Sequence, residues 1–249
     1  MQNTMVSIIM PSYKSERFIA QAIESVISQT YTNWEMIIVD DKSPDNANVI
    51  IKSYIEKDKR IQLIELEQNS GPAVARNKAI LESKGRYIAF LDSDDMWIAT
   101  KLEKQILWMQ TKKCALSYTS YFIIDESGKE QGVFITKEQV SYWDLLKTNS
   151  IGCLTAIYDT DTLGKVLMPN IIKKQDYALW LKILKQIDNG YGMLEPLAYY
   201  RIVENSVSRN KFAGLKYLWN IYRDLERLNI FQTLYYFASY IYYGVRKYK

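Results

Sequence analysis

The sequence predicts an α/β fold: a mostly parallel, Rossmann-like sheet flanked by helices and followed by C-terminal helices. Through the first 112 residues, short apolar runs alternate with longer segments that are apolar on one helical face. This alternation is typical of parallel strands joined by crossover helices. Polar or acidic residues directly follow three of the apolar runs, at the sheet edge where ligands of such folds bind.

Four strands are predicted in the first half, each from a short apolar run: residues 6–10, 35–41, 61–66 and 86–91. Three helices separate them, at residues 15–29, 43–58 and 72–85. Ser15 and Ser43 are of the type that caps helix N-termini, and Pro72, after Gly71, suits a first helical turn. Gly85 would end the third helix.

The pattern changes after about Thr111. The predicted elements are a hairpin over residues 114–137, a short helix over 141–148, a strand over 152–159, a helix over 175–187 and a strand over 197–202. A polar loop follows at residues 203–210, and from Lys211 the chain is predicted to be helical to its end.

Composition excludes several classes of function. The chain of 249 residues has no histidine, so catalytic triads and histidine-bearing zinc motifs are excluded. Its net charge of +4 is too small for a nucleic-acid binder but suits anionic small molecules or an anionic membrane surface. Cys114 and Cys153 lie far apart without a CxxC pair, which favours a reducing, cytosolic compartment. Neither a signal peptide nor a membrane-spanning segment is expected.

Three acids, Asp92, Asp94 and Asp95, follow the fourth predicted strand in YIAFLDSDDMW. Because like charges at this spacing raise one another's pKa, a bound cation would relieve them. Mg²⁺ and Mn²⁺ often bind one or two carboxylates together with a ligand's phosphates. A second interpretation is an acidic turn before a helix that starts near Met96, with Asp95 as its N-cap. A phosphatase of the haloacid dehalogenase type is a third, but Met96 stands where those enzymes have threonine.

Six motifs follow one another along the chain: MPSYKSERFIAQAIESVISQTY, VDDKSPD, NSGPAVARNKAI, FLDSDD, QDYALWLKIL and YRIVENSVS. Together they resemble the inverting nucleotide-sugar glycosyltransferases of family 2, from about Val6 to Ser208. The resemblance implies the GT-A, or nucleotide-diphospho-sugar transferase, fold. It also implies a nucleotide-sugar-binding half at residues 1–112, an acceptor-binding and catalytic half of the same domain at 113–210, and a helical tail at 211–249.

The resemblance implies a nucleotide site, whose residues would be Pro11, Ser12, Tyr13, Asp40, Asp41, Gly71, Arg76, Asp92 and Ser93. Tyr13 would stack on the base, and Asp41, with Asp40 beside it, would accept the base's N–H. Gly71 would allow close backbone approach, and Arg76 would lie near the ribose, the diphosphate or the acids.

The resemblance also implies a divalent cofactor, Mn²⁺ or Mg²⁺, with Asp94 as its direct ligand and Asp92 near the ribose and the sugar. Asp176 matches the general base of the family, and without histidine it is the best candidate to deprotonate an acceptor hydroxyl. Relatives usually have Glu where this chain has Gln175, so one negative charge beside the base is removed. The implied reaction is a single displacement that inverts the anomeric configuration.

Arg201, Ser206 and Ser208 match a segment that closes over the donor in relatives. Many relatives have histidine where this chain has Val203. The extra metal or diphosphate contact of that histidine is therefore not expected from this position.

The tail at residues 230–249 is rich in tyrosine, ends in basic residues and has one apolar helical stripe. The stripe consists of Phe231, Leu234, Tyr235, Ala238, Ile241, Tyr242 and Val245. Such a helix could lie on the surface of an anionic membrane. The pattern equally fits a helix that packs on its own domain or on a second subunit in a homodimer. The membrane interpretation would place the protein on the cytoplasmic face and make the acceptor a lipid-linked saccharide.

The sequence thus predicts a metal-dependent inverting glycosyltransferase that moves a hexosyl or N-acetylhexosaminyl group. The donor is a nucleotide-sugar, with a UDP-sugar favoured, and the acceptor is a saccharide. Its implied process is surface-polysaccharide synthesis (O-antigen, capsule or lipooligosaccharide). One alternative is a sugar-nucleotide nucleotidyltransferase, although no glycine-rich phosphate loop follows the first strand. Another is a catalytically inactive nucleotide-binding scaffold at the membrane, which the intact Asp94 and Asp176 disfavour.

Overall fold

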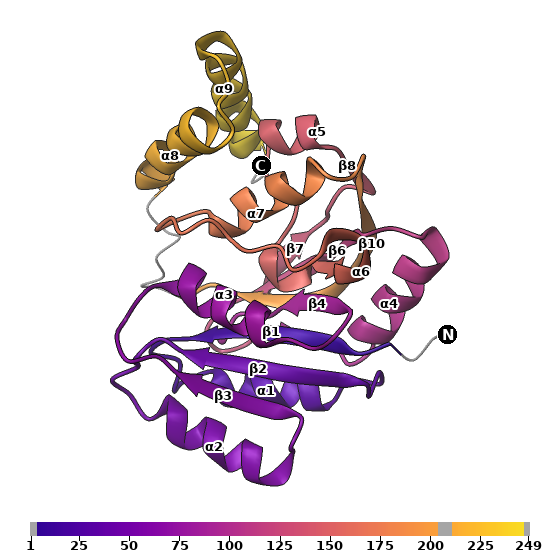
Figure 1. Cartoon of the computed structure of the whole chain (residues 1–249), viewed down its shortest axis with the longest axis vertical. Coiled ribbons are helices and arrows are strands. Elements are labelled where there is room, and N and C mark those ends of the chain that lie inside the picture. Colours follow the sequence, from indigo (N-terminus) through magenta and orange to yellow (C-terminus); the bar gives the residue numbers. More distant parts are fainter. Residues whose placement is uncertain (1–3, 204–210, 247–249) are drawn as a thin grey trace.

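The computed structural model describes residues 4–203 and 211–246, and its helices pack on both faces of a twisted sheet (Figure 1). The strands are β1 Val6–Ser12, β2 Trp34–Asp40, β3 Ile61–Glu65, β4 Tyr87–Phe90, β5 Met96–Trp97, β6 Leu116–Ile124, β7 Glu130–Phe134, β8 Gln139–Val140, β9 Ile157–Asp159 and β10 Gly190–Arg201. Within the described residues they form one sheet in the order β3-β2-β1-β4-β9-β6-β10-β5, with β7 on β6 and β8 on β10.

The helices of the described residues complete the layers. They are α1 Ile19–Ile27, α2 Ala47–Lys57, α3 Pro72–Glu82, α4 Lys101–Lys112, α5 Tyr142–Lys147, α6 Thr160–Leu163, α7 Gln175–Leu184, α8 Lys211–Asn220 and α9 Ile230–Arg246. Ile23 of α1, Ile51 of α2 and Ile106 of α4 share one core, while Ile80 of α3 and Trp180 of α7 belong to a second core. The sheet is therefore covered on both faces.

The first half confirms the predicted strands and their parallel pairing. β1 pairs in parallel with β2 and β4, and β2 with β3. Every residue of β2 is buried, as expected for a central strand covered on both faces. Their carboxyl ends therefore lie at one edge of the sheet.

Two predicted helix N-caps are wrong. α1 begins only at Ile19, and the Ser15 carbonyl accepts the Ile19 N–H (2.9 Å) within the preceding turn. α2 begins at Ala47, and the backbone N–H of Ser43 donates to the Asp40 carboxylate (3.0 Å). In both places, contacts among the residues that follow a strand lengthen the loop before the helix.

The third helix starts at Pro72 as predicted but ends at Glu82, short of Gly85. A Cβ on Gly85 would lie 2.6 Å from the backbone nitrogen of Ser7. Gly85 is therefore required for close contact with β1, and its expected role as a helix end is wrong.

The acidic turn does not cap a helix at Met96, because Met96–Trp97 form β5, which pairs antiparallel with β10. Asp95 instead accepts the backbone N–H of Arg201 on β10 (2.8 Å). The interpretation of Asp95 as an N-cap is wrong, since tertiary pairing fixes the chain here as a strand.

The second half confirms the β6–β7 hairpin, and α5 has a capping box between Ser141 and Asp144. The strand predicted over 152–159 is shorter: a 3₁₀ turn occupies Cys153–Thr155, and β9 covers only Ile157–Asp159. The last strand, β10, is longer than predicted because it pairs in parallel with β6 along most of its length.

The C-terminal segment is helical as predicted, but it is not one helix. α8 continues into a π-helical turn at Ile221–Leu225, and α9 begins at Ile230. The inner face of α9 packs on the second core through Tyr236, Phe237 and Tyr240. No helix among the described residues combines the length and the apolar character that crossing a membrane requires.

Candidate active site

The predicted site residues of the first half gather at the carboxyl ends of three parallel strands. Ser12 ends β1, Asp40 ends β2, and Asp92 lies just beyond β4. Because these strands are neighbours and parallel, their ends bring the three loops together.

Ser12 and Asp40 are buried, and their polar atoms are used within the protein. The Ser12 hydroxyl contacts the Ser15 hydroxyl (2.8 Å) and donates to Asp40 (3.5 Å). Asp40 also accepts from the backbone of Ser43 (3.0 Å) and from the Asn48 amide (3.1 Å). In this structure Asp40 organises the loop between β2 and α2.

Asp41 joins two of the loops that were predicted to contact the nucleotide. Its carboxylate accepts the backbone N–H groups of Ser70 (2.6 Å) and Gly71 (2.8 Å). Each carboxylate oxygen has a further lone pair, so Asp41 can still accept a hydrogen bond from a ligand. Gly71 has φ 90°, a conformation that glycine adopts without strain. Nothing lies within 4 Å of a Cβ built on Gly71, so its backbone conformation, rather than crowding within the protein, accounts for the glycine.

The acidic loop after β4 concentrates negative charge at the site. Burial, reinforced by the Asp92 carboxylate, raises the pKa of Asp94 to about 6. Burial also raises the pKa of Asp95 well above its ordinary value, with Asp94 and Asp92 adding to the effect. Asp92 itself is ion-paired with Arg76.

Arg201 lies beneath this loop and not over an open donor pocket. It is 2% exposed. Its guanidinium donates to the carbonyl of Asp94 (2.9 Å) and to the side chain of Gln21 (2.7 Å), and it lies 4.4 Å from the centroid of the Phe18 ring. In this position Arg201 fixes the acidic loop against α1. Ser206 and Ser208, its predicted partners, lie outside the described residues.

Asp176 lies at the second position of α7, half-buried, beside the first-half site. Burial raises the pKa of its carboxyl, while the Tyr177 backbone, Arg76 and Lys174 act in the opposite direction. Arg76 thus contacts Asp92 and interacts electrostatically with Asp176. The structure therefore brings the predicted base and the predicted donor acids to the same place from distant parts of the chain.

A pocket of about 220 Å³ opens between the loop after β1 and the acidic loop. It is lined by Tyr13, Lys14, Ser15, Arg17, Phe18, Ser93, Asp94 and Val203. Three predicted site residues, Tyr13, Ser93 and Asp94, share it, and Tyr13 is 44% exposed. Pro11, the remaining member of the first loop, is partly buried within β1.

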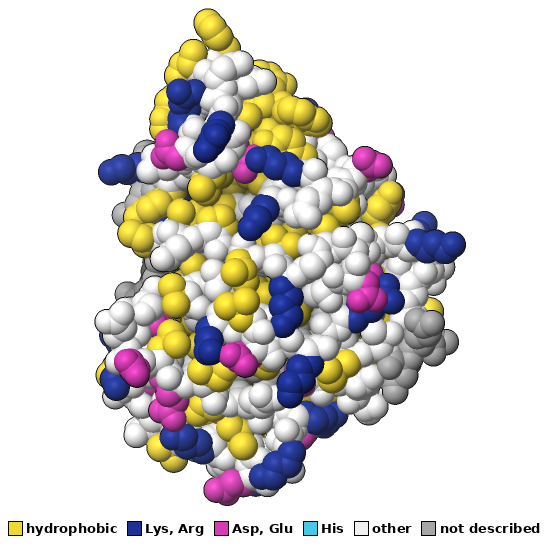
Figure 2. Space-filling model, viewed as in Figure 1, with side chains coloured by type: hydrophobic (Ala, Val, Ile, Leu, Met, Phe, Trp, Pro, Cys, Tyr) yellow, Lys and Arg dark blue, Asp and Glu magenta, His cyan; other side chains and the backbone are white. Residues whose placement is uncertain are grey.

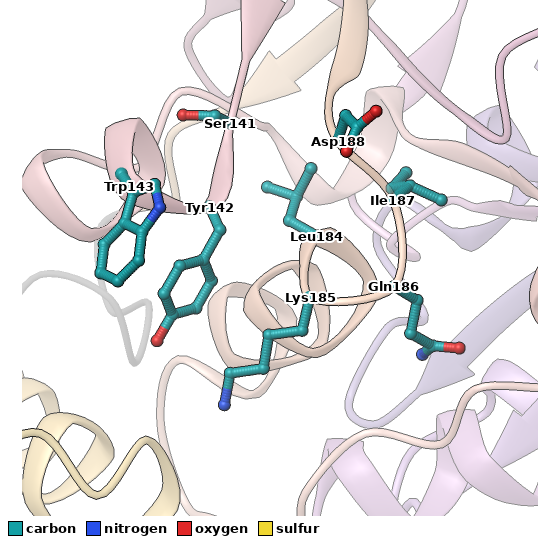
Figure 3. A pocket seen from close by; sticks show the side chains of 8 residues that line it. All are labelled: Ser141, Tyr142, Trp143, Leu184, Lys185, Gln186, Ile187 and Asp188. Atoms are coloured by element: carbon teal, nitrogen blue, oxygen red, sulfur yellow. The ribbon is translucent and has the colours of Figure 1, made fainter.

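A larger pocket of about 440 Å³ lies elsewhere, between α5 and the C-terminal end of α7 (Figure 3). Ser141, Tyr142 and Trp143 line one side of it, and Lys185 and Gln186 line another. None of the predicted site residues lines this pocket, so its size does not identify the site.

The acids of the loop suit a divalent cation. Asp92, Asp94 and Asp95 supply carboxylate oxygens around one turn, and burial, with the charge of Asp92 adding to it, raises the pKa of Asp94. Among residues 4–203 and 211–246 no group of three or more acidic or cysteine side chains is arranged to hold a metal ion by itself. A Mg²⁺-type ion does not need one, because it commonly keeps ligand phosphates and water in its shell.

Sequence reasoning missed two residues at the site. Cys153, on the 3₁₀ turn before β9, interacts electrostatically with Arg76, Asp92 and Asp176. Lys174 precedes α7 and acts on Asp176. No motif marks Cys153, whereas the pair Lys173-Lys174, separated from the predicted base only by Gln175, is a visible signal of positive charge.

Three features together define what the site can do chemically. It has an acidic loop for a cation, a partly exposed aromatic residue for a planar base, and a carboxylate of raised pKa, Asp176, that interacts with the Arg76–Asp92 pair. Such a set suits proton removal from a hydroxyl next to a bound, metal-associated phosphate ester.

Comparison with known proteins finds similar sequences among glycosyltransferases. The model of the family described as "Glycosyl transferase family 2" matches residues 7–160. A Bacillus subtilis protein named as a teichuronic acid biosynthesis glycosyltransferase, TuaG, is 45% identical over 98% of this chain and 97% of its own length. An Escherichia coli protein, WfgD, is 41% identical over 99% of this chain and 96% of its own. Its name is UDP-Glc:alpha-D-GlcNAc-diphosphoundecaprenol beta-1,3-glucosyltransferase.

A solved structure has the same arrangement of elements. It is the mannosyltransferase PcManGT from Pyrobaculum calidifontis, in complex with GDP-Man and Mn²⁺. The likeness has a TM-score of 0.71 at 15% sequence identity, and it covers 89% of this chain and 64% of the other. At that identity the likeness concerns the fold.

Proposed function

The chain belongs to glycosyltransferase family 2 and has the GT-A fold, and on that premise we propose that it transfers a sugar from a UDP-sugar to a lipid-linked saccharide, with inversion at the anomeric carbon. The observation that carries this proposal is the placement of Asp176 beside the Arg76–Asp92 pair. A base next to the donor acids is the arrangement that a single displacement needs.

The donor part of the proposal rests on the loops after β1 and β2. Tyr13 is 44% exposed beside Ser93 and Asp94, with the Lys14 Nζ 5.3 Å from its ring centroid, so the exposed part of the ring can stack on a base. Asp41 has lone pairs available for the imide N–H of uracil. The relative WfgD carries UDP-Glc in its name, which favours a UDP-sugar, and glucose is the first sugar to test.

We assign the metal site to Asp94, with Asp92 beside it. Bound there, Mn²⁺ or Mg²⁺ would neutralise negative charge on the departing diphosphate. The succession of carboxylates on the acidic loop supports the assignment, and the solved structure of PcManGT is a complex with Mn²⁺. Arg201 holds the Asp94 backbone in place for this role.

The chemical step places Asp176 as the general base. An acceptor hydroxyl oxygen forms a bond to the anomeric carbon while the bond from that carbon to the diphosphate oxygen breaks, and the hydroxyl proton passes to the Asp176 carboxylate. Attack from the face opposite the leaving group inverts the configuration. Because burial raises the pKa of Asp176, its carboxylate is a stronger base than a solvated aspartate.

The acceptor part rests on the C-terminal helix and on the relatives. The names of TuaG and WfgD connect them with teichuronic acid and with a diphosphoundecaprenol-linked sugar. In this chain, α9 leaves a stripe of large apolar side chains in solvent: Phe231 is 81% exposed, Tyr235 58% and Leu234 52%. Figure 2 shows hydrophobic side chains gathered at the tip of the molecule over α9, with basic side chains beside them.

We therefore propose that α9 lies on an anionic membrane surface at the cytoplasmic face. Exposed Arg223 and Arg227, just before α9, complement such a surface. Aromatic side chains with basic neighbours favour the headgroup region of a bilayer. Contact with a lipid surface would bring the protein to an acceptor of the kind named for WfgD.

The proposal is tested by two substitutions in the purified protein with a UDP-sugar panel, Mn²⁺ and a diphosphate-lipid acceptor. Asp176→Asn should lower kcat by about 10²–10⁴-fold, because it removes the base, while UDP-sugar affinity stays within about threefold. Asp94→Asn should abolish the metal-dependent part of UDP-sugar binding, measured by calorimetry.

Asp188→Asn is the matched control, since Asp188 is an exposed aspartate after the far end of α7. It should keep wild-type kinetics. Full activity of Asp176→Asn would refute the base assignment. UDP-sugar binding without turnover in the wild type would favour the inactive scaffold instead.

A further inference from the structure

Lys174 is held in place by the C-terminal helix. Its Nζ donates to the Tyr240 hydroxyl (3.0 Å) and lies 4.7 Å from the centroid of the Tyr240 ring. Tyr240 also packs edge-on against Tyr177 of α7, at 5.8 Å between ring centroids. The Lys174 ammonium group is thus fixed between α9, the proposed membrane helix, and α7, which carries the proposed base.

The backbone of Lys174 stands at the start of α7. Lys174 is the N-cap residue with φ 62°, and no side chain caps the helix. Asp176 follows in the first turn, where backbone N–H groups and the helix dipole favour anions. A cation and an uncapped helix start therefore lie together beside the proposed base.

The Lys174 charge has no close anionic partner within the described part of the chain. Ion pairs of residues 4–203 and 211–246 do not include Lys174, and its hydrogen-bond acceptor is a neutral hydroxyl. The residue is half-buried, so part of its hydration is lost. A half-buried ammonium group that forms no ion pair, and whose interaction with the Asp176 carboxylate is only longer-range, is a favourable binding place for an anion.

We propose that Lys174, positioned by Tyr240, binds the diphosphate of the lipid-linked acceptor. This inference rests on the proposed function, and the ligand class is a saccharide joined through a diphosphate to a lipid. In such a molecule the hydroxyl groups of the first sugar lie within one ring of the phosphate. A diphosphate on Lys174 would therefore hold an acceptor hydroxyl near Asp176.

The position of Lys174 favours the acceptor's diphosphate over that of the donor. Asp94, the proposed metal ligand, interacts chiefly with Asp92, Arg201 and Arg76, whereas Lys174 interacts with Asp176. Lys174 also touches the α8–α9 side of the molecule, since its Cε lies 3.6 Å from a Cβ built on Gly214. Lys174 thus contacts the C-terminal helices, whereas the donor acid Asp92 pairs with Arg76.

The test compares two acceptors with the same sugar, one joined to a lipid by a diphosphate and one joined to a neutral alkyl chain. Lys174→Asn removes the charge and keeps a residue type that tolerates positive φ. The ratio of kcat/KM for the diphosphate acceptor to that for the neutral acceptor should fall by about 10–100-fold, mainly through the KM of the diphosphate acceptor. The KM of the UDP-sugar should change by less than about threefold.

Two further variants make the result specific. Lys174→Arg should restore most of the ratio because it restores the charge. Tyr240→Phe, which removes only the positioning hydroxyl, should lower the ratio in the same direction but less. Lys182→Asn is the matched control, since Lys182 is an exposed lysine further along α7, and it should keep the wild-type ratio.

The outcomes separate this inference from the proposed function. An unchanged ratio in Lys174→Asn, with an active wild type, would overturn the assignment of Lys174 alone. A raised KM for the UDP-sugar with an unchanged ratio would do the same and would assign Lys174 to the donor diphosphate. A wild type that transfers to neither acceptor would overturn both the inference and the function on which it rests.

Discussion

At the scale of single residues, Arg76 connects the two halves of the candidate site. Burial opposes its charge, but Asp92 and the neighbouring acids outweigh this and raise the pKa of Arg76. Its Nε is buried without a hydrogen-bond partner among the described residues. A buried donor without a partner is costly, and an oxygen atom of a bound ligand would satisfy it.

The raised pKa of Asp176 predicts how sugar transfer depends on pH. Burial raises the pKa of Asp176, and only its ionised form accepts a proton. Activity should therefore be lost as the pH falls through the raised pKa, which lies above the ordinary aspartate value of about 3.9. The measurement is kcat against pH at saturating substrates, where the acid limb reports the base in the complex.

A variant of Arg76 tests this prediction, because Arg76 lowers the pKa of Asp176. Arg76→Gln should move the acid limb to higher pH. A limb at or below pH 4 in the wild type, or no movement in the variant, would contradict the electrostatic account of the base.

At the scale of elements, β10 determines the shape of the acidic loop. β10 pairs with β5 directly after Asp95, and Arg201 at its end binds the loop through both backbone and side chain. The same guanidinium reaches the carbonyls of Asp125 and Glu126 in the β6–β7 turn (3.3 Å each). The last strand thus joins the acidic loop, the hairpin and α1.

Arg201→Met tests this connection. It would leave several carbonyl oxygens without their donor, and we expect a loss of about 3 kcal/mol of unfolding free energy. That corresponds to a Tm lower by about 6–12 °C for a chain of this size. Calorimetry should also show Mn²⁺-dependent UDP-sugar binding weakened by about tenfold or more, because the backbone of Asp94 would lose its support.

The control for this prediction is Arg223→Met, which replaces an exposed arginine after α8. It should change Tm much less and leave donor binding as in the wild type. Equal donor affinity in wild type and Arg201→Met would show that the loop holds its shape without Arg201.

At the scale of the whole molecule, one sheet runs through both halves of the chain. α9 lies at the periphery of the molecule (Figure 1), and it has a buried face and an exposed face. The inner face contacts Tyr177 of α7 through Tyr240, while Phe231 and Tyr235 are exposed. A surface of this kind is typical of a binding site for a lipid bilayer or another chain. We assign it to the bilayer because of the basic residues beside it.

The assignment predicts sedimentation with anionic vesicles. The double variant Phe231→Ser/Tyr235→Ser should bind at least about tenfold more weakly, since each large apolar side chain contributes about 1.5–3 kcal/mol when fully buried. Raised salt should weaken wild-type binding further by screening the basic residues. Val49→Ser, at an apolar position of α2 that is 68% exposed, should bind like the wild type.

Two results would contradict the proposed binding of α9 to a membrane. One is a wild type that stays in solution with vesicles at every salt concentration. The other is a dimer in solution that the Phe231→Ser/Tyr235→Ser substitutions dissociate, which would assign the face of α9 to a second copy of the chain.

The sequence by itself determined the class of the fold, most of its elements and the family. Periodicity is a local property, so the buried runs of β1, β2 and β4 and the amphipathic pattern of α7 could be recognised without the structure. The motifs also predicted a set of site residues, several of which the structure brings together at the candidate site. Helix starts were less predictable, because contacts such as that between Ser43 and Asp40 delay the helix.

Only the tertiary structure decided which of these residues meet and what each one contacts. The pairing of Met96–Trp97 with β10, the burial of Arg201 beneath the acidic loop and the contact of Tyr240 with Lys174 all join segments far apart in the sequence. Such contacts depend on how the sheet and helices pack in space. No local pattern of residue types encodes them.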